Sequence, residues 1–524
     1  MKTRTAALMT RTGALMTLAT AIGAAACGGG FAERYAMMPA PSMAVSGEVA
    51  PPAMSREGYD AIAESPFLDV VTAPLSTFAI DVDTASYANV RRFITQQRLP
   101  PPDAVRIEEL LNYFDYAYPA PTGAVPFSVN AEVAEAPWNP AHRLVHVGLQ
   151  GRRIETADLP PANLVFLLDV SGSMNSPDKL PLLKQAFALL VGQLRPQDHV
   201  AIVVYAGAAG LVLPSTAGDE QGTINEALDS LEAGGSTAGG EGIELAYAVA
   251  REHFVKGGTN RVILATDGDF NVGTSSDGEL VRLIEAERES GVFLTILGFG
   301  TGNYQDAKME KLSNAGNGNA AYIDSALEAR KVLVNEIGGT LVTIAKDVKV
   351  QVEFNPARVK AYRLIGYENR LLAARDFNDD RKDAGELGAG HSVTALYEIV
   401  PAGAAEDVGT VDPLKYQRVT ATGVAPSGEL MTIKLRYKQP EGDVSALITG
   451  TIADEGLTLT QTSDAFRFAS AVAELGLLLR ESPHQGRADH AALIERARGA
   501  LGTDVHGYRR DFVALAEAAR ALAQ

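Results

Sequence analysis

The centre of the chain alternates short apolar runs with amphipathic segments, and this alternation constrains the fold more than any other feature. The apolar runs have the length of buried strands, and the segments between them repeat apolar residues at helical spacing. Such an alternation predicts a doubly wound, mostly parallel α/β sheet. The expected strands are 164–168, 199–205, 261–266, 292–300 and 320–324, and the expected helices are 179–194, 243–254, 278–290, 306–315 and 327–337.

Oxygen-bearing side chains follow these strands where parallel α/β sheets bind their ligands, at the carboxyl ends. VFLLDVSGSM carries Asp169, Ser171 and Ser173, LEAGGSTAGGEG carries Thr237, and RVILATDGD carries Asp267. Mg²⁺ takes about six oxygen ligands and keeps several waters. The three hydroxyls are expected to ligate the ion directly, while the two aspartates balance its charge and hold waters. One coordination position then stays open. Mn²⁺ and Ca²⁺ are the alternatives.

This set resembles the metal-ion-dependent adhesion site of von Willebrand factor type A (VWA) domains, whose pattern is Asp-x-Ser-x-Ser, then Thr, then Asp. The resemblance implies a Rossmann-like VWA fold and a magnesium site built from the five residues above. Ser236 is the alternative to Thr237. The alternative for the whole set is a polar turn after each strand, with Ser171 capping the helix that follows.

The similarity extends beyond the central segment. The phrases IDVDTASYANVRRF, PPPDAVRIEELLNYFDYAYP, YRLIGYENR and DFNDDRKDAGELGAGHSVTALYEI look like those of bacterial VWA lipoproteins, from about residue 75 onward. The resemblance covers nearly all of the chain after that point. It indicates a class of protein more than a particular activity.

The N-terminus has the pattern of an export signal, with basic residues before the apolar run GALMTLATAIGAAAC, which is short for a membrane span. Cys27, the sole cysteine, directly follows three alanines. This resembles a lipoprotein signal, in which the cysteine becomes the lipid-modified first residue. Ala24 stands where that signal usually has Leu, so ordinary cleavage is an alternative, as is a structural thiol. Gly28 lacks acidic retention character, and we therefore expect a lipid anchor in the outer membrane of a bacterial cell envelope.

Strand-like runs lie on both sides of the α/β segment. Because neither flank alone has many strands, we expect both to form one β-sandwich into which the α/β domain is inserted. With 524 residues, 46% of them hydrophobic, the chain can bury more than one core. The expected organisation is a lipoprotein-type signal peptide at 1–27, a flexible tether at 28–74, an N-terminal α+β flanking domain at 75–158, the VWA domain at 159–340, a β-rich domain at 341–455, and C-terminal helices at 456–524.

A second acidic segment, DFNDDRKDAGE, resembles the first half of a calcium loop, with Asp376, Asn378 and Asp380 on alternate positions. Arg381 stands where such loops need Gly, and Leu387 stands at the twelfth position, where a Glu is expected. A solvated acidic hairpin loop is therefore the favoured interpretation.

Net charge and the absence of known catalytic motifs limit the functions that this protein can have. A net charge of −18 argues against nucleic-acid binding. The sequence contains no HExxH, Walker or GxSxG motif, so we expect no enzyme. The favoured interpretation is a membrane-anchored exported binding protein whose metal ion coordinates an Asp or Glu of a protein partner. The alternatives are a metal-dependent hydrolase of cell-envelope material and an assembly co-factor of an envelope complex.

Overall fold

The computed structural model describes residues 57–235, 239–268, 277–336, 338–339, 342–382, 384–409, 415, 428–440 and 442–524. These residues belong to one compact unit that begins at Met54. The predicted signal peptide with Cys27 lies outside the described residues, and so do Ser236 and Thr237.

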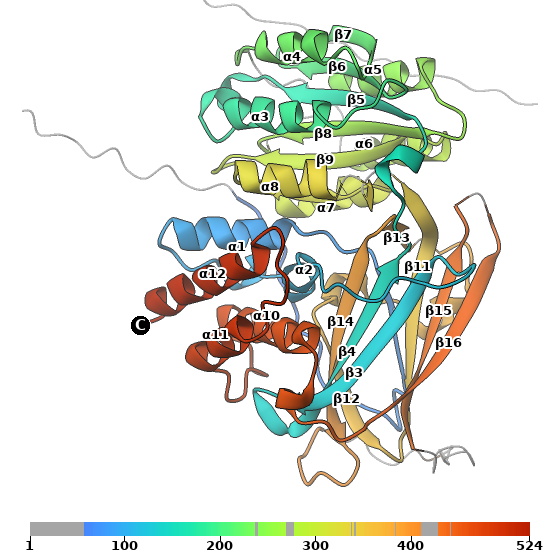
Figure 1. The fold of residues 1–524 in the computed structure, drawn as a ribbon, viewed down its shortest axis with the longest axis vertical. Coiled ribbons are helices and arrows are strands. Elements are labelled where there is room, and N and C mark those ends of the chain that lie inside the picture. The colour runs from blue at the N-terminus through green and yellow to red at the C-terminus, as the bar shows by residue number, and fades with distance from the viewer. Residues whose placement is uncertain are drawn as a thin grey trace, which may run out of the picture. The chain divides into compact units, whose positions relative to one another are not determined.

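The central domain contains a six-stranded sheet with the order β10-β9-β8-β5-β6-β7 (Figure 1). Every neighbouring pair is parallel except β6 and β7. The predicted doubly wound sheet is therefore confirmed, with an antiparallel edge strand added, as is common in such sheets. The strands are β5 (Ala162–Asp169), β6 (His199–Tyr205), β7 (Ala209–Ala217), β8 (Thr259–Thr266), β9 (Phe293–Phe299) and β10 (Ala320–Ile323).

Helices cover both faces of this sheet because alternate strand residues point to opposite sides. Phe166 packs in one core with α3, α4 and α8, whereas Val165 and Leu167 pack in the other with α5, α6 and α7. The helices are α3 (Leu180–Val191), α4 (Gln221–Asp229), α5 (Gly239–Glu252), α6 (Asp277–Glu289), α7 (Asp306–Ala315) and α8 (Ala326–Arg330).

The two flanks form one β-sandwich, as predicted. One sheet has the order β1-β12-β14-β4-β3, and the other has the order β13-β11-β15-β16 with β2 also paired to β11. Each sheet thus joins strands from before and after the α/β domain, around a shared apolar core. The strands are β1 (Leu68–Asp69), β2 (Leu75–Ala79), β3 (Phe127–Ala136), β4 (Asn139–Gly151), β11 (Thr343–Phe354), β12 (Val359–Ile365), β13 (Gly385–Gly388), β14 (Ser392–Pro401), β15 (Glu429–Lys438) and β16 (Ser445–Ala453).

The last part of the predicted tether differs from the expectation, because it packs on the folded body. Leu68–Asp69 pairs with β12, and Val70 is buried in the sandwich core. Further upstream, Glu57 forms an ion pair of 2.8 Å with Arg92. Sandwich pairing and a buried ion pair therefore hold residues that composition alone assigned to a flexible segment.

Helices from both ends of the chain pack together against the sandwich (Figure 1). Phe114 contacts Phe468 and Phe512 edge to face, with ring centroids 5.0 and 5.7 Å apart. The expected packed C-terminal helices are present, and N-terminal helices complete their core. The helices are α1 (Ala85–Thr95), α2 (Ile107–Asn112), α10 (Asp464–Leu479), α11 (His490–Arg498) and α12 (Tyr508–Leu522).

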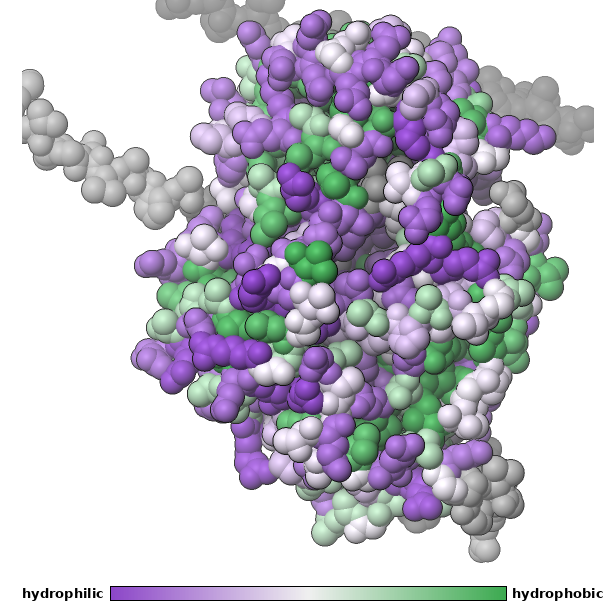
Figure 2. Space-filling model, in the orientation of Figure 1, coloured by the Kyte–Doolittle hydropathy of each residue, from purple (hydrophilic) through white to green (hydrophobic). Residues whose placement is uncertain are grey.

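Short helical turns connect several of these elements. They are η1 (Pro102–Ala104), η2 (Thr156–Asp158), η3 (Gly172–Asn175), η4 (Lys331–Asn335), η5 (Glu368–Arg370), η6 (Ala374–Asn378) and η7 (Leu459–Gln461). Among the helices of the described ranges, none combines the length and apolar character that crossing a bilayer requires. The face in Figure 2 is largely hydrophilic, with hydrophobic residues showing over the β15–β16 hairpin, where Leu447 is 57% exposed.

Candidate metal centre

Two neighbouring parallel strands place the predicted aspartates at one edge of the sheet. β5 ends at Asp169, and β8 ends at Thr266, directly before Asp267. The register pairs Asp169 with Tyr205 at the end of β6. Asp169 Oδ2 accepts hydrogen bonds from the hydroxyls of Tyr205 at 3.1 Å and Thr266 at 3.2 Å. The ends of three adjacent strands therefore converge on one carboxylate.

The other oxygen of Asp169 shapes the first loop. Asp169 Oδ1 accepts a hydrogen bond of 2.9 Å from the backbone N–H of Ser171, which turns the chain so that Ser171 Oγ lies 3.1 Å from Ser173 Oγ. Ser171 stands at the N-cap position of η3, yet its side chain makes no capping hydrogen bond. The alternative interpretation of Ser171 as a helix cap is therefore wrong, because its hydroxyl faces its neighbour serine instead.

The Gly-rich loop that leads to Thr237 runs beside this first loop. The Gly172 N–H donates to the Gly235 carbonyl at 3.1 Å, and the Gly234 N–H donates to the Val170 carbonyl at 2.8 Å. Gly235 adopts a φ of +80°, a backbone conformation that glycine allows without steric cost. These backbone contacts join the two loops directly before the predicted threonine, which itself lies outside the described residues.

Lys179 is a residue of the site that sequence reasoning missed. Its Nζ donates to Asp267 Oδ2 at 2.8 Å, and their side chains are 8% and 0% exposed. Lys179 is the N-cap residue of α3, where the helix dipole disfavours a cation. A lysine at the N-terminus of a helix needs a nearby anion to offset the helix dipole. This unfavourable position is the sequence feature that could have indicated an acidic partner for Lys179.

The electrostatics of the cluster favour a bound cation. Burial, together with the nearby charge of Asp267, raises the pKa of Asp169, although hydrogen bonds from Ser171 act in the opposite direction. Lys179 offsets only one of the two buried carboxylates. Hydroxyl and carboxylate oxygens are the donors that a hard cation prefers, so the residues present fit Mg²⁺. The described ranges contain no group of three or more His, Cys, Asp or Glu suited to a metal, and this set instead depends on serine hydroxyls.

The second acidic segment has protein partners. Asn378 Oδ1 accepts from Arg436 at 2.7 Å, and Asp380 lies 3.5 Å from the same guanidinium and also bonds Ser445. Asp376 lies 3.7 Å from the guanidinium of Arg375. The structure therefore places arginines beside all three members of the predicted calcium-like pattern.

Comparisons with known proteins show which family this chain resembles. A family model described as von Willebrand factor type A domain matches residues 163–336, one described as von Willebrand factor matches 53–146, and one described as the C-terminal part of the uncharacterized protein YfbK matches 339–522. The uncharacterized protein YfbK of Escherichia coli strain K12 is 44% identical over 470 residues, which are 88% of this chain and 80% of that protein.

Two solved structures also match this chain. A von Willebrand factor type A protein from Catenulispora acidiphila is 17% identical with a TM-score of 0.38, and the match covers 74% of this chain and 89% of that one. The ArnB paralog VWA2 from Sulfolobus acidocaldarius is 14% identical with a TM-score of 0.36, covering 76% and 98%. From the identity and coverage of the YfbK match together with the VWA family match, the chain belongs to the family of YfbK-like bacterial proteins that contain a von Willebrand factor type A domain.

Proposed function

We propose that this protein is a binding protein of the bacterial cell envelope that holds Mg²⁺ at Ser171, Ser173 and Thr237, with Asp169 and Asp267 behind them. The bound ion supplies a positive centre with an open coordination position for an Asp or Glu of a protein partner. The observation that carries this proposal is the pair of serine hydroxyls 3.1 Å apart, which Asp169 positions at the sheet edge.

The residues around the ion have separate tasks. Hydrogen bonds from Tyr205 and Thr266 hold Asp169 in one orientation, so the serine loop is positioned before any ligand arrives. Lys179 adds a positive charge beside Asp267. With two carboxylates, one ammonium group and a divalent cation, the cluster has a net positive charge, which favours an anionic group from the partner.

Membrane attachment is the second part of the proposal. Cys27 follows three alanines in an export-signal pattern, and we propose it as the lipid attachment site, with the outer membrane as the location. The test is mass spectrometry of the mature N-terminus together with fractionation of a Cys27→Ser variant. A mature chain without lipid on Cys27, or unchanged fractionation of the variant, contradicts the anchor.

The metal site is tested by titration of MgCl₂ into the full-length chain, followed by calorimetry and thermal unfolding. We expect saturable binding that the double substitution Ser171→Ala and Ser173→Ala abolishes. The control is Ser230→Ala, because the exposed Ser230 hydroxyl donates to the Ala227 carbonyl of its own backbone turn. Binding that persists in the double variant contradicts the assigned ligands.

Partner binding is tested by capture from an envelope extract, with and without EDTA, using the wild-type chain and the same two variants. Capture should require the ion, survive Ser230→Ala and fail in the double variant. Partners identified by capture are then tested with each surface Asp and Glu replaced by its amide. Capture that survives EDTA contradicts coordination through the metal.

A further inference from the structure

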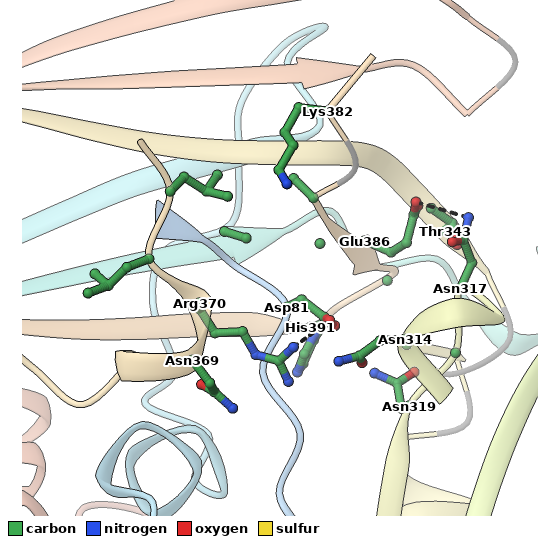
Figure 3. A pocket seen from close by; sticks show the side chains of 18 of the residues that line it. Asp81, Asn314, Asn317, Asn319, Thr343, Asn369, Arg370, Lys382, Glu386 and His391 are labelled. Atoms are coloured by element: carbon green, nitrogen blue, oxygen red, sulfur yellow. Dashed lines mark hydrogen bonds and ion pairs between the residues drawn. The ribbon is translucent and has the colours of Figure 1, made fainter. Parts of the chain in front are cut away.

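A polar cavity of about 310 Å³ lies between the α/β domain and the β-sandwich (Figure 3). The α/β domain contributes the beginning of β8 and the segment after α7, whereas the sandwich side contributes β13 and the segments around Asp81 and Arg370. Its polar lining includes Asp81, Arg261, Asn314, Asn319, Arg370 and Glu386.

Arg261, one of the lining residues, has a buried charge without an ion-pair partner among the described residues. It is 2% exposed. Its Nη1 donates to Thr295 Oγ1 at 2.7 Å, while its Nε has no hydrogen-bond partner in the part of the chain that the structure describes. Burial lowers the pKa of Arg261 to about 10, which still leaves the guanidinium charged at neutral pH. Phe293 lies beneath it, with the ring centroid 5.7 Å away.

Arg370, the other arginine that lines this cavity, has several carboxylate partners. Arg370 lies 3.2 Å from Asp81, 3.6 Å from Asp83 and 2.8 Å from Glu310, so carboxylates of the protein already balance its charge. A buried charge without a counterion destabilises the folded protein, which is why buried charges are normally paired. The negative charge of Glu386, which also lines the cavity, acts on Arg261, although the two side chains form no ion pair. Arg261 is therefore short of a close anion.

Amide groups line the same cavity. In Figure 3, Asn314 and Asn319 lie opposite Asp81 and Arg370. Asn314 Oδ1 is buried and has no hydrogen-bond partner within the described ranges. Asparagine amides both donate and accept hydrogen bonds, so they suit the hydroxyl groups of a ligand. The exposed Lys382 adds a third cation to the lining, after Arg261 and Arg370.

We propose that this cavity binds a small oxyanion of monosaccharide size, whose charged group pairs with Arg261 and whose hydroxyl groups bond the asparagine amides. The cavity volume is at the lower end of the range for small-molecule pockets. The site is distinct from the metal centre. Arg261 is near the start of β8 and Asp267 directly follows its end, and at about 3.3 Å per strand residue they are roughly 20 Å apart.

The test is calorimetric titration of the full-length chain with sodium phosphate, sodium glucuronate and glucose at constant ionic strength. We expect saturable binding of at least one anion and none of the neutral sugar. Binding of glucuronate alone assigns a sugar carboxylate, and binding of phosphate alone assigns a phosphate group. Glucose binding as tight as glucuronate binding, or the absence of saturable binding by both anions, overturns the proposal.

Substitutions of cavity residues test whether the anion binds in this cavity. Arg261→Gln should weaken anion binding about tenfold or more, while Arg251→Gln should not, because Arg251 lies on the exposed face of α5. Lys382→Glu changes an exposed residue and should also weaken anion binding, so it tests the proposal even if Arg261→Gln fails to fold. Unchanged anion affinity in Lys382→Glu and in folded Arg261→Gln contradicts the proposal. Mg²⁺ binding should stay unchanged in every variant, which separates this site from the metal centre.

Discussion

Lys179 Nζ lies 2.8 Å from Asp267 Oδ2 within the same buried cluster as Asp169. A buried ammonium group therefore lies close to the proposed metal site. Because like charges repel strongly in a buried site, Lys179 should weaken Mg²⁺ binding while it strengthens the attraction of the site for an anionic partner group.

The first prediction follows from this relationship. Lys179→Met should lower the melting temperature of the metal-free protein, because it removes the buried cation beside Asp267. It should also tighten Mg²⁺ binding by about tenfold, since roughly 1.4 kcal/mol of repulsion disappears. Calorimetry with MgCl₂ measures the affinity. Lys184→Met is the control, because the Lys184 ammonium donates to the Asp229 carbonyl at the surface. Weaker Mg²⁺ binding in Lys179→Met would show that the ammonium supports the ion.

A second prediction concerns Gly300, which lies against the aliphatic part of Lys179. A Cβ at Gly300 would stand 2.3 Å from Lys179 Cγ, and φ is +73° there. Gly302 has a φ of +92°, but a Cβ added at Gly302 would meet no atom of the described residues within 4 Å. Gly302→Ala should therefore cost about 1–2 kcal/mol from backbone strain alone. Gly300→Ala should cost more and should also alter Mg²⁺ affinity. Equal stability of the two variants in urea unfolding would argue against the contact with Lys179.

The third prediction concerns the ion pairs between the α/β domain and its flank. Arg106 forms buried ion pairs with Asp306 at the start of α7 and with Glu109 in α2. Asp306→Ala should destabilise the protein by about 3–5 kcal/mol in urea unfolding, because it leaves a buried guanidinium with incomplete charge compensation. Asp115→Ala, which removes an exposed pair with Arg153, should change the stability little. A small effect of Asp306→Ala would mean that Glu109 alone balances Arg106.

A fourth prediction concerns pH. His142 Nδ1 and Nε2 each lie 2.6 Å from a carboxylate oxygen, of Glu398 and Glu406 respectively. Burial by itself would lower the pKa of His142, but these carboxylates outweigh it and raise the pKa above 6.5. The stabilisation is complete below the unfolded-state pKa and is lost as pH rises through the raised folded-state value.

His142→Gln should consequently reduce the free energy of unfolding more at pH 6 than at pH 9, as measured by urea titrations. The exposed His253 provides the control variant, His253→Gln. A difference between wild type and His142→Gln that grows toward pH 9 would contradict a raised pKa.

Sequence and structure agree best where an element depends on residues that are close together in the chain. The expected strand 199–205 coincides with β6, and the expected helix 306–315 coincides with α7. Both patterns depend on residues close together in the chain. The edge strand β7 was not predicted, because only one side of an edge strand is paired and its Leu211 and Val212 are exposed.

The sequence by itself determined the alternating sheet and the order of hydroxyl and carboxylate residues at its edge, because strand and helix periods are local properties. Tertiary structure decided which distant groups meet. Lys179 pairs with Asp267 across 88 positions, and folding leaves Arg261 in a cavity without a close anion among the described residues. Such contacts depend on how separate elements pack, and that packing has no signature in a local sequence pattern.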